Sequence, residues 1–238
     1  MDTLLEILRT EDGGDSKTAA ATELLELGTE QFSSVFAMAL VQVFRESPPD
    51  TKNHVAWLLG NLAKRGKARE LTKAGAIKVV VEHIRTAKGI KEFGLPLAAL
   101  DNFLLADKET AINVGKEVGD YLGGSLDEVV WFLLFFKHTD EFRGLILRGG
   151  DEMKELTFKS KNAKELFESM KKMKPDPYCQ SLKCHHCHEL LASWRTGKYN
   201  CPGCGHEQEI PSLGENLLLQ LEERDSASHD EDTPSKKE

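Results

Sequence analysis

The chain has 238 residues, which is long enough for one large domain or for a main domain with a small one. Hydrophobic residues make up 40% and charged residues 29%, and this balance excludes a wholly disordered chain. The net charge of −8 means that the molecule as a whole repels nucleic acid and anionic lipid. All five cysteines lie between residues 179 and 204, and this clustering favours metal ligation over a disulfide network.

The sequence also predicts where the protein resides. Asp2 stands where a secretory signal carries positive charge, and no long apolar stretch follows it. The longest wholly apolar run, residues 129–136, is far shorter than the roughly 20 residues that span a bilayer. We therefore expect an intracellular protein, cytoplasmic or nuclear and not secreted, that makes no membrane contact.

From Thr3 to about Ser169, apolar residues recur at helical spacing with breaks at Gly or Pro, which predicts helices and no strands. Ser16 and Thr51 are candidate N-caps. Gly75 suits a sharp turn that needs a positive φ or a close backbone approach. The predicted helices span residues 16–28, 32–44, 51–65, 67–74, 76–87, 95–106, 108–114, 125–138, 141–147 and 151–171.

Parts of the helical region repeat. Residues 55–63 match a later segment at an offset of 74, and a segment between them at an offset of 41. The successive spacings between the copies are therefore 41 and then 33 residues, and these bracket the period of about 40 residues that helical solenoids show. The stretch 56–63 (AWLLGNLA), followed by the turn at Gly75, resembles the armadillo family, and the resemblance extends over roughly residues 16–159.

The armadillo resemblance implies a mainly α fold, with a right-handed armadillo- or HEAT-like solenoid over residues 1–158; an unrelated helical bundle is the alternative. Members of this family bind extended peptides, with an Asn holding the peptide backbone and, in the importin-α type, a Trp one turn earlier. Trp57 and Asn61 match that pair and lie on one helix face. The second unit has only the matching asparagine, Asn102, and the third unit has only the matching tryptophan, Trp131. The resemblance implies that these four residues line a short partner-binding groove; otherwise the tryptophans are core residues and the asparagines cap turns.

The strongest pattern is a pair of Cys-x2-Cys motifs, formed by Cys184, Cys187, Cys201 and Cys204. Two such knuckles supply the four thiolates that Zn²⁺ prefers and leave no coordination position open, which predicts one structural zinc ion. The pattern resembles a zinc ribbon, which we assign to residues 179–211. Iron in a rubredoxin-like site, or a histidine in place of one thiolate, is the alternative, and we expect Cys179 to be a reduced bystander.

Within the ribbon, residues 190–195 and 198–200 are predicted to form a hairpin, with a further strand at 207–210. Gly205 allows the backbone to turn back toward sulfur. Residues 159–178 form a basic helical connector, residues 212–223 form a C-terminal helix, and residues 224–238 form a disordered acidic tail. The connector either meets a polyanion or is a solvated helix face with Leu166 and Phe167 turned inward.

No catalytic motif occurs in the sequence, and no small-molecule substrate is indicated. We therefore expect a non-enzymatic adaptor or scaffold that binds a protein or peptide segment, with the zinc ribbon as a second contact. The alternative is a nucleic-acid-binding or transcription-associated factor that uses the basic connector and the ribbon. Its contacts would be Lys183, Trp194, Arg195, Lys198 and Tyr199.

Overall fold

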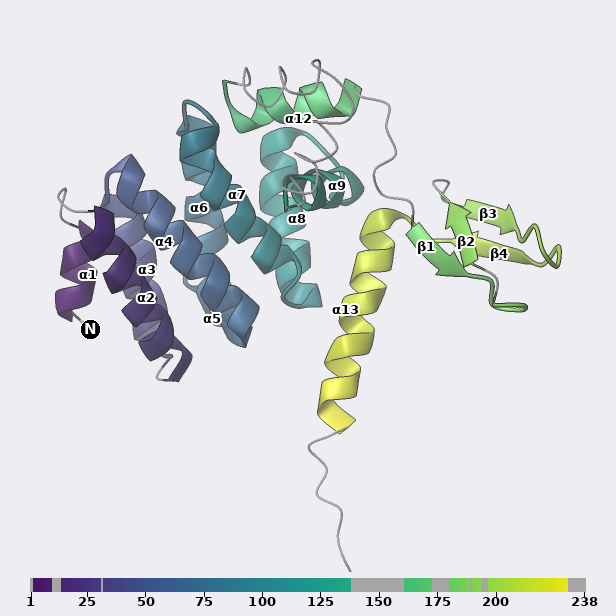
Figure 1. The fold of residues 1–238 in the computed structure, drawn as a ribbon, viewed down its shortest axis with the longest axis horizontal. Helices are drawn as coiled ribbons and strands as arrows, with labels where there is room; N and C mark the ends of the chain where they lie inside the picture. The colour runs from purple at the N-terminus through teal and green to yellow at the C-terminus, as the bar shows by residue number, and fades with distance from the viewer. Residues whose placement is uncertain are drawn as a thin grey trace, which may run out of the picture. The chain divides into compact units, whose positions relative to one another are not determined.

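The structure is a computed structural model that describes residues 2–9, 14–30, 32–137, 161–172, 180–188, 190–193 and 197–230. The chain divides into two compact units, residues 1–171 and 172–238 (Figure 1). The first unit is helical, and the second carries short strands and one helix. The first unit includes residues 161–171, which the sequence had assigned to the connector at 159–178.

The N-terminal unit confirms the mainly α prediction. None of the described helices combines the length and the apolar character that crossing a membrane requires. The helices are α1 (Asp2–Arg9), α2 (Gly14–Glu30), α3 (Ser34–Glu46), α4 (Pro49–Leu62), α5 (Ala68–Lys73), α6 (Ala76–Thr86), α7 (Ile90–Leu104), α8 (Lys108–Leu122), α9 (Leu126–Lys137) and α12 (Ala163–Lys172).

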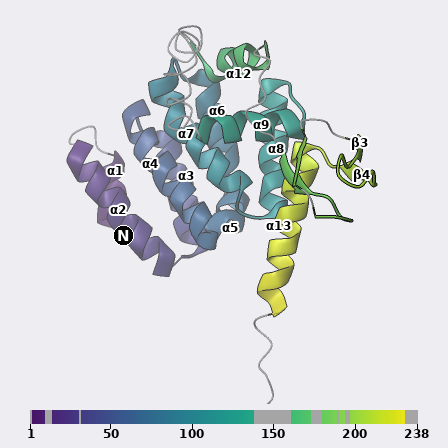
Figure 2. The same cartoon turned by 45° about the vertical axis from the view of Figure 1, so that its right-hand side comes forward.

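These helices pack in two layers. Helices α2, α4, α7 and α9 contact one another in that order, and we call them the α2/α4/α7/α9 layer. Helices α1, α3, α6 and α8 form the second layer, and each contacts at least one helix of the first (Figures 1 and 2). The core between the layers is apolar, so burial of hydrophobic surface holds the unit together. Its largest fully buried side chains include Phe36, Phe44, Phe93, Phe103 and Leu58.

Helices α4 and α7 approach closely at Gly60. A Cβ atom at this position would lie 2.8 Å from the Cα atom of Ala99, nearer than two such atoms approach in folded proteins. Only glycine allows the two helices to pack at this distance. The same contact brings the Asn102 side chain against Gly60, beside Asn61.

Several predicted helix ends are confirmed. Gly75 has a φ of 89°, as the turn between α5 and α6 requires. Since an added Cβ there would meet only a distant arginine nitrogen at 3.9 Å, the backbone conformation and not crowding demands glycine. Gly66, with a φ of 84°, interrupts the helical conformation after Arg65.

The cap predictions at Ser16 and Thr51 are wrong. Helix α2 begins at Gly14, and α4 begins at Pro49, so both residues lie inside helices. Thr51 is buried, and its hydroxyl accepts a hydrogen bond of 2.8 Å from the Nζ atom of Lys17. Proline suits the first helical position because its missing N–H has no helical acceptor there.

Helix α7 begins at Ile90, earlier than the predicted start at residue 95, and contains Pro96. A proline inside a helix has no N–H to donate to the carbonyl four residues before it, here that of Glu92. The imidazole Nε2 of His83 on α6 lies 3.2 Å from that carbonyl oxygen. Tertiary packing therefore supplies the donor that Pro96 lacks.

Helix α12 packs on the N-terminal unit. Leu166 and Phe167 are buried, as the solvated-face interpretation predicted, and the Phe167 ring meets the Phe132 ring edge-on at 5.1 Å. The basic stretch is therefore not a free connector along its whole length. The predicted helix at 141–147 and the first part of the helix at 151–171 lie outside the described residues.

The C-terminal unit contains two antiparallel hairpins. Strand β1 (Gln180–Lys183) pairs with β2 (Leu190–Ser193), and β3 (Gly197–Asn200) pairs with β4 (Glu207–Ile210). The prediction that residues 190–195 and 198–200 form a hairpin is therefore wrong. Each hairpin instead carries one Cys-x2-Cys motif in its loop.

Helix α13 (Leu213–Asp230) follows the second hairpin. Ser212 and Glu215 form a reciprocal cap, in which each side chain accepts a hydrogen bond from the backbone N–H of the other, at 3.2 and 2.9 Å. The helix continues past the predicted end at residue 223, so disorder from residue 224 is wrong as far as Asp230. Residues 231–238 lie outside the described part of the chain.

Candidate metal centre and binding surface

The four predicted cysteine ligands meet at the two hairpin loops. Their Sγ atoms all lie within 4.8 Å of one another. The Sγ atoms of Cys184 and Cys204 are 3.6 Å apart, as are those of Cys187 and Cys201. A tetrahedral ion with Zn–S bonds of about 2.3 Å separates its sulfurs by about 3.8 Å. The four thiols can therefore hold one metal ion, and the donor set is consistent with Zn²⁺.

The two knuckles have the same backbone geometry. The N–H of His188 donates to the carbonyl of Cys184 at 2.9 Å, and the N–H of Gly205 donates to the carbonyl of Cys201 at 2.8 Å. Both donors have a positive φ, 59° for His188 and 73° for Gly205. Glycine adopts this conformation readily, whereas histidine does so at a cost. The turn predicted for Gly205 is confirmed, and its counterpart at His188 carried no sequence signal.

The local backbone also prepares Cys184 for a metal. The N–H groups of Cys187 and His186 hydrogen-bond to its sulfur and lower the pKa of the thiol to about 6, although burial acts in the opposite direction. Cys184 and Cys201 are buried with Tyr199 packed against them, and Cys187 and Cys204 are exposed. A thiolate is the form that ligates metal, so this backbone favours the ligand state of Cys184 near neutral pH. Burial and the neighbouring sulfurs of Cys184 and Cys201 instead raise the pKa of the Cys204 thiol.

Four exposed histidines surround the knuckles: His185, His186, His188 and His206. The rings of His186 and His206 stack with centroids 5.5 Å apart. The metal-binding group found in the described part of the chain contains cysteines alone. Replacement of a thiolate by histidine is therefore not favoured, and Cys179 lies outside the described residues.

All four predicted groove residues fall on the α2/α4/α7/α9 layer. Trp57 and Asn61 lie on α4, Asn102 lies on α7 and Trp131 lies on α9. Trp57 is 36% exposed, which is not the burial of a core residue. The Nδ2 atom of Asn61 donates to the carbonyl of Trp57 at 2.8 Å, so this amide does not cap a turn. The structure does not describe the side chain of Trp131.

The sequence prediction missed one apolar residue of this surface. Leu95 on α7 is 43% exposed, and it lies on the same helix face as Ala98 and Asn102, at spacings of three and seven residues. Its spacing to Asn102 is readable in the sequence, but a leucine in an apolar helix is ordinarily assigned to the core. Only the packing shows that Leu95 faces outward.

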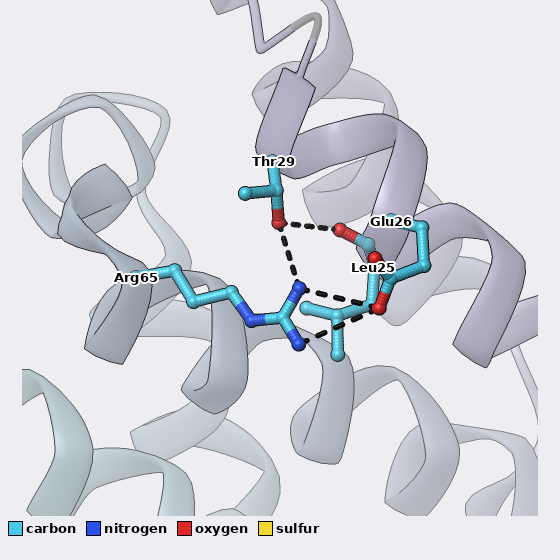
Figure 3. Close-up of polar contacts among 4 residues, drawn as sticks. All are labelled: Leu25, Glu26, Thr29 and Arg65. Carbon is cyan, nitrogen blue, oxygen red and sulfur yellow. Dashed lines mark hydrogen bonds and ion pairs between the residues drawn. The ribbon is translucent and has the colours of Figure 1, made fainter.

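A polar network joins α2 to Arg65, three residues after the end of α4 (Figure 3). The guanidinium of Arg65 donates to the hydroxyl of Thr29 at 3.0 Å and to the carboxylate of Glu26 at 3.4 Å. Thr29 in turn donates to the carbonyl of Leu25 at 2.7 Å. The network ties two neighbouring helices of the α2/α4/α7/α9 layer together at its surface.

The structure describes three of the five residues proposed for nucleic-acid contact. Lys183 is exposed, but Lys198 pairs with Glu207 at 3.1 Å, and Tyr199 packs against the buried cysteines. Trp194 and Arg195 lie outside the described residues.

No family model, curated protein or solved structure matches this chain. Its class therefore rests on its own geometry: a mainly helical protein with a group of four cysteines that can hold a metal ion.

Proposed function

We propose that the protein is a non-enzymatic interaction adaptor. In this proposal the N-terminal unit is an armadillo-like solenoid that binds an extended segment of a partner protein along the α2/α4/α7/α9 layer. Two observations support a solenoid: helix pairs follow one another in two layers, and the positive-φ turn at Gly75 separates a short helix from a longer one, as between armadillo helices.

The observation that carries the proposal is the exposure of Trp57 beside two asparagines. A large aromatic ring at the surface has apolar area to gain from a partner, and rigid aromatic side chains are frequent anchors of protein interfaces. The close approach at Gly60 brings Asn102 next to the helix that carries Asn61. Their amides offer a donor and an acceptor to a peptide backbone, and Leu95 extends the apolar surface on α7.

The C-terminal unit is proposed to be a zinc ribbon with one structural ion. Four thiolates fill a tetrahedral Zn²⁺ shell, so no position is left for a reacting water. The buried core of this unit is small, and the metal would provide much of its stability. The ribbon then serves as a rigid second contact for partners.

A nucleic-acid-binding function is the weaker proposal. Acidic side chains outnumber basic ones among the described residues of the C-terminal unit, and Lys198 is paired with Glu207. Phosphate binding depends on basic groups that replace counterions, so these charges favour a protein partner. Saturable binding to labelled single-stranded RNA at low salt would reverse this preference.

The adaptor proposal is tested by replacing both Trp57 and Asn61 with alanine. Wild-type and variant chains are tagged, captured from the native cell, and their bound proteins are compared by mass spectrometry. We expect at least one protein to be lost with the variant, because the aromatic anchor and the amide are removed together. Overlapping peptides of that protein should include one extended segment that binds wild type alone.

The matched control is the double change Met38→Ala and Gln42→Ala. These residues have the same spacing, are exposed, and lie on α3 in the opposite layer. The control should retain every partner of the wild type. Identical bound sets for the wild type and the Trp57, Asn61 variant would refute the groove.

A further inference from the structure

A groove in the C-terminal unit lies between strand β4 and helix α13, and the proposed function assigns no ligand to it. Its volume is about 830 Å³. Strand β4 and the turn after it form one wall, and one face of α13 forms the other. The groove is long enough for several residues of a peptide, because its helical wall extends from Ser212 to Glu223.

The walls of this groove are acidic. Glu209 on β4 and the pair Glu215 and Glu223 on α13 line it, and all three are exposed. No lysine or arginine is among the described residues that line the groove. Glu215 accepts a hydrogen bond from the N–H of Ser212, which holds its carboxylate in place. Opposite walls of one charge favour a positively charged occupant.

An exposed apolar residue occupies the middle of the helical wall. Leu219 is 51% exposed, whereas Leu221 on the same helix is 4% exposed. Leu219 lies four residues from Glu215 and four from Glu223, so the three share one helix face. An occupant with an apolar side chain at this point would bury Leu219 and gain hydrophobic free energy.

A buried amide lines the same groove. Gln208 on β4 is only 7% exposed, and its Oε1 accepts a hydrogen bond of 3.0 Å from the N–H of His185. Its Nε2 is not among the buried side-chain atoms of the described residues that lack a partner. A peptide carbonyl in the groove would supply an acceptor for this amide group.

We propose that this groove binds an extended segment of a partner protein in the order basic, any, apolar, any, basic. The spacing follows from the two geometries. Glu215 and Glu223 are about 12 Å apart along the helix, at 1.5 Å per residue. Alternate residues of an extended peptide point the same way, and four steps of about 3.3 Å cover about 13 Å. Two basic side chains then meet Glu215 and Glu223 while the apolar one meets Leu219.

The experiment uses the full zinc-loaded chain and a fluorescein-labelled heptapeptide, Gly-Arg-Ser-Leu-Ser-Arg-Gly, with binding followed by fluorescence anisotropy. We expect saturable binding. The change Glu223→Lys should weaken it about tenfold, since it removes an attraction and adds a repulsion. The matched control is Glu222→Lys, which alters the neighbouring residue that does not line the groove and should change the affinity by less than about twofold.

The apolar contact is tested with Leu219→Ala and with a peptide whose leucine is replaced by serine. Each change alone should weaken binding, and Leu219→Ala should have little further effect on the serine peptide, because the contact is already lost. Zinc content and circular dichroism confirm that each variant is folded. Equal weakening by Glu222→Lys and Glu223→Lys, additive effects at Leu219, or preferential binding of labelled single-stranded RNA would each overturn the proposal.

Discussion

Two residues in equivalent turns, His188 and Gly205, place the cysteine sulfurs. Both hold a positive φ and donate to the carbonyl of the first cysteine of their knuckle. An added Cβ at Gly205 would meet no atom within 4 Å. Any cost of a side chain there is therefore conformational, and the left-handed region costs an L-residue about 1–2 kcal/mol.

We expect Gly205→Ala to weaken zinc binding and His188→Gly to strengthen it, each by about 1 kcal/mol or roughly fivefold, because metal binding and folding of the ribbon are coupled. Competition of the full chain against a chromophoric zinc chelator measures both changes. Gly203→Ala is the control, because Gly203 lies in the same knuckle without a positive φ. An unchanged or lower affinity in His188→Gly would show that the histidine is not strained.

At the scale of the element, helix α6 compensates for the hydrogen bond that Pro96 removes from helix α7. The carbonyl of Glu92 loses its helical donor and lies 3.2 Å from the His83 Nε2. The buried ring of His83 also meets Phe44 edge-on, at 5.7 Å between ring centroids. A periodicity argument within α7 cannot find this donor, since it comes from another helix.

We expect His83→Phe to destabilise the N-terminal unit by about 1–2 kcal/mol, since it leaves the Glu92 carbonyl unsatisfied while keeping the aromatic contact. In a Pro96→Ala background the cost should be smaller by about 1 kcal/mol, because residue 96 then has its own N–H to donate. The wild type, the two single variants and the double variant form a double-mutant cycle. Urea unfolding of each full chain, followed by circular dichroism, measures the four free energies of unfolding. His54→Phe, on α4, is the control and should cost the same in both backgrounds.

The pH dependence of the free energy of unfolding gives a second test of the role of His83. Burial, and then the positive charge of Lys52, lowers the pKa of His83. The unfolded chain, with a histidine pKa of about 6.5, then binds the proton more readily than the folded one. The stability contributed by neutral His83 is present above about pH 6.5 and is lost as the pH falls toward the folded pKa. Between neutral and mildly acidic pH, the free energy of unfolding should therefore change less steeply with pH in His83→Phe than in the wild type. An unchanged slope would contradict a lowered pKa of His83 in the folded chain.

At the scale of the whole molecule, the two units have separate cores. The N-terminal core consists of large apolar side chains from two layers of helices, whereas the centre of the ribbon contains Cys184, Cys201 and Tyr199. A core this small does not hold a hairpin pair together without its metal. The proposed zinc ion should therefore matter to one unit only.

We expect a strong zinc chelator to unfold the ribbon and spare the N-terminal unit. Far-ultraviolet circular dichroism should keep most of its helical signal, because the helices of the N-terminal unit supply most of it. Limited proteolysis should cut first within residues 172–238, and added zinc should restore resistance. Loss of most helix on chelation would contradict the separation into two units.

The sequence by itself determined two properties of this protein: its mainly helical character and the four cysteines that can hold a metal ion. Both are local. Apolar residues at helical spacing predict a helix from residues that are close in sequence. Each Cys-x2-Cys pair likewise predicts a turn that brings its two sulfurs toward one ion. For the same reason the positive φ at Gly75 and at Gly205 was predictable, since glycine signals it directly.

Only the tertiary structure decided which segments meet. The hairpins pair β1 with β2 and β3 with β4 across the knuckle loops, a register that residues 190–200 alone do not encode. Helix α7 accommodates Pro96 where His83 supplies a donor from α6. Leu95 is exposed on a helix that meets α4 at Gly60 and Ala99. Each outcome depends on residues distant in sequence, whose burial and hydrogen bonds exist only after packing.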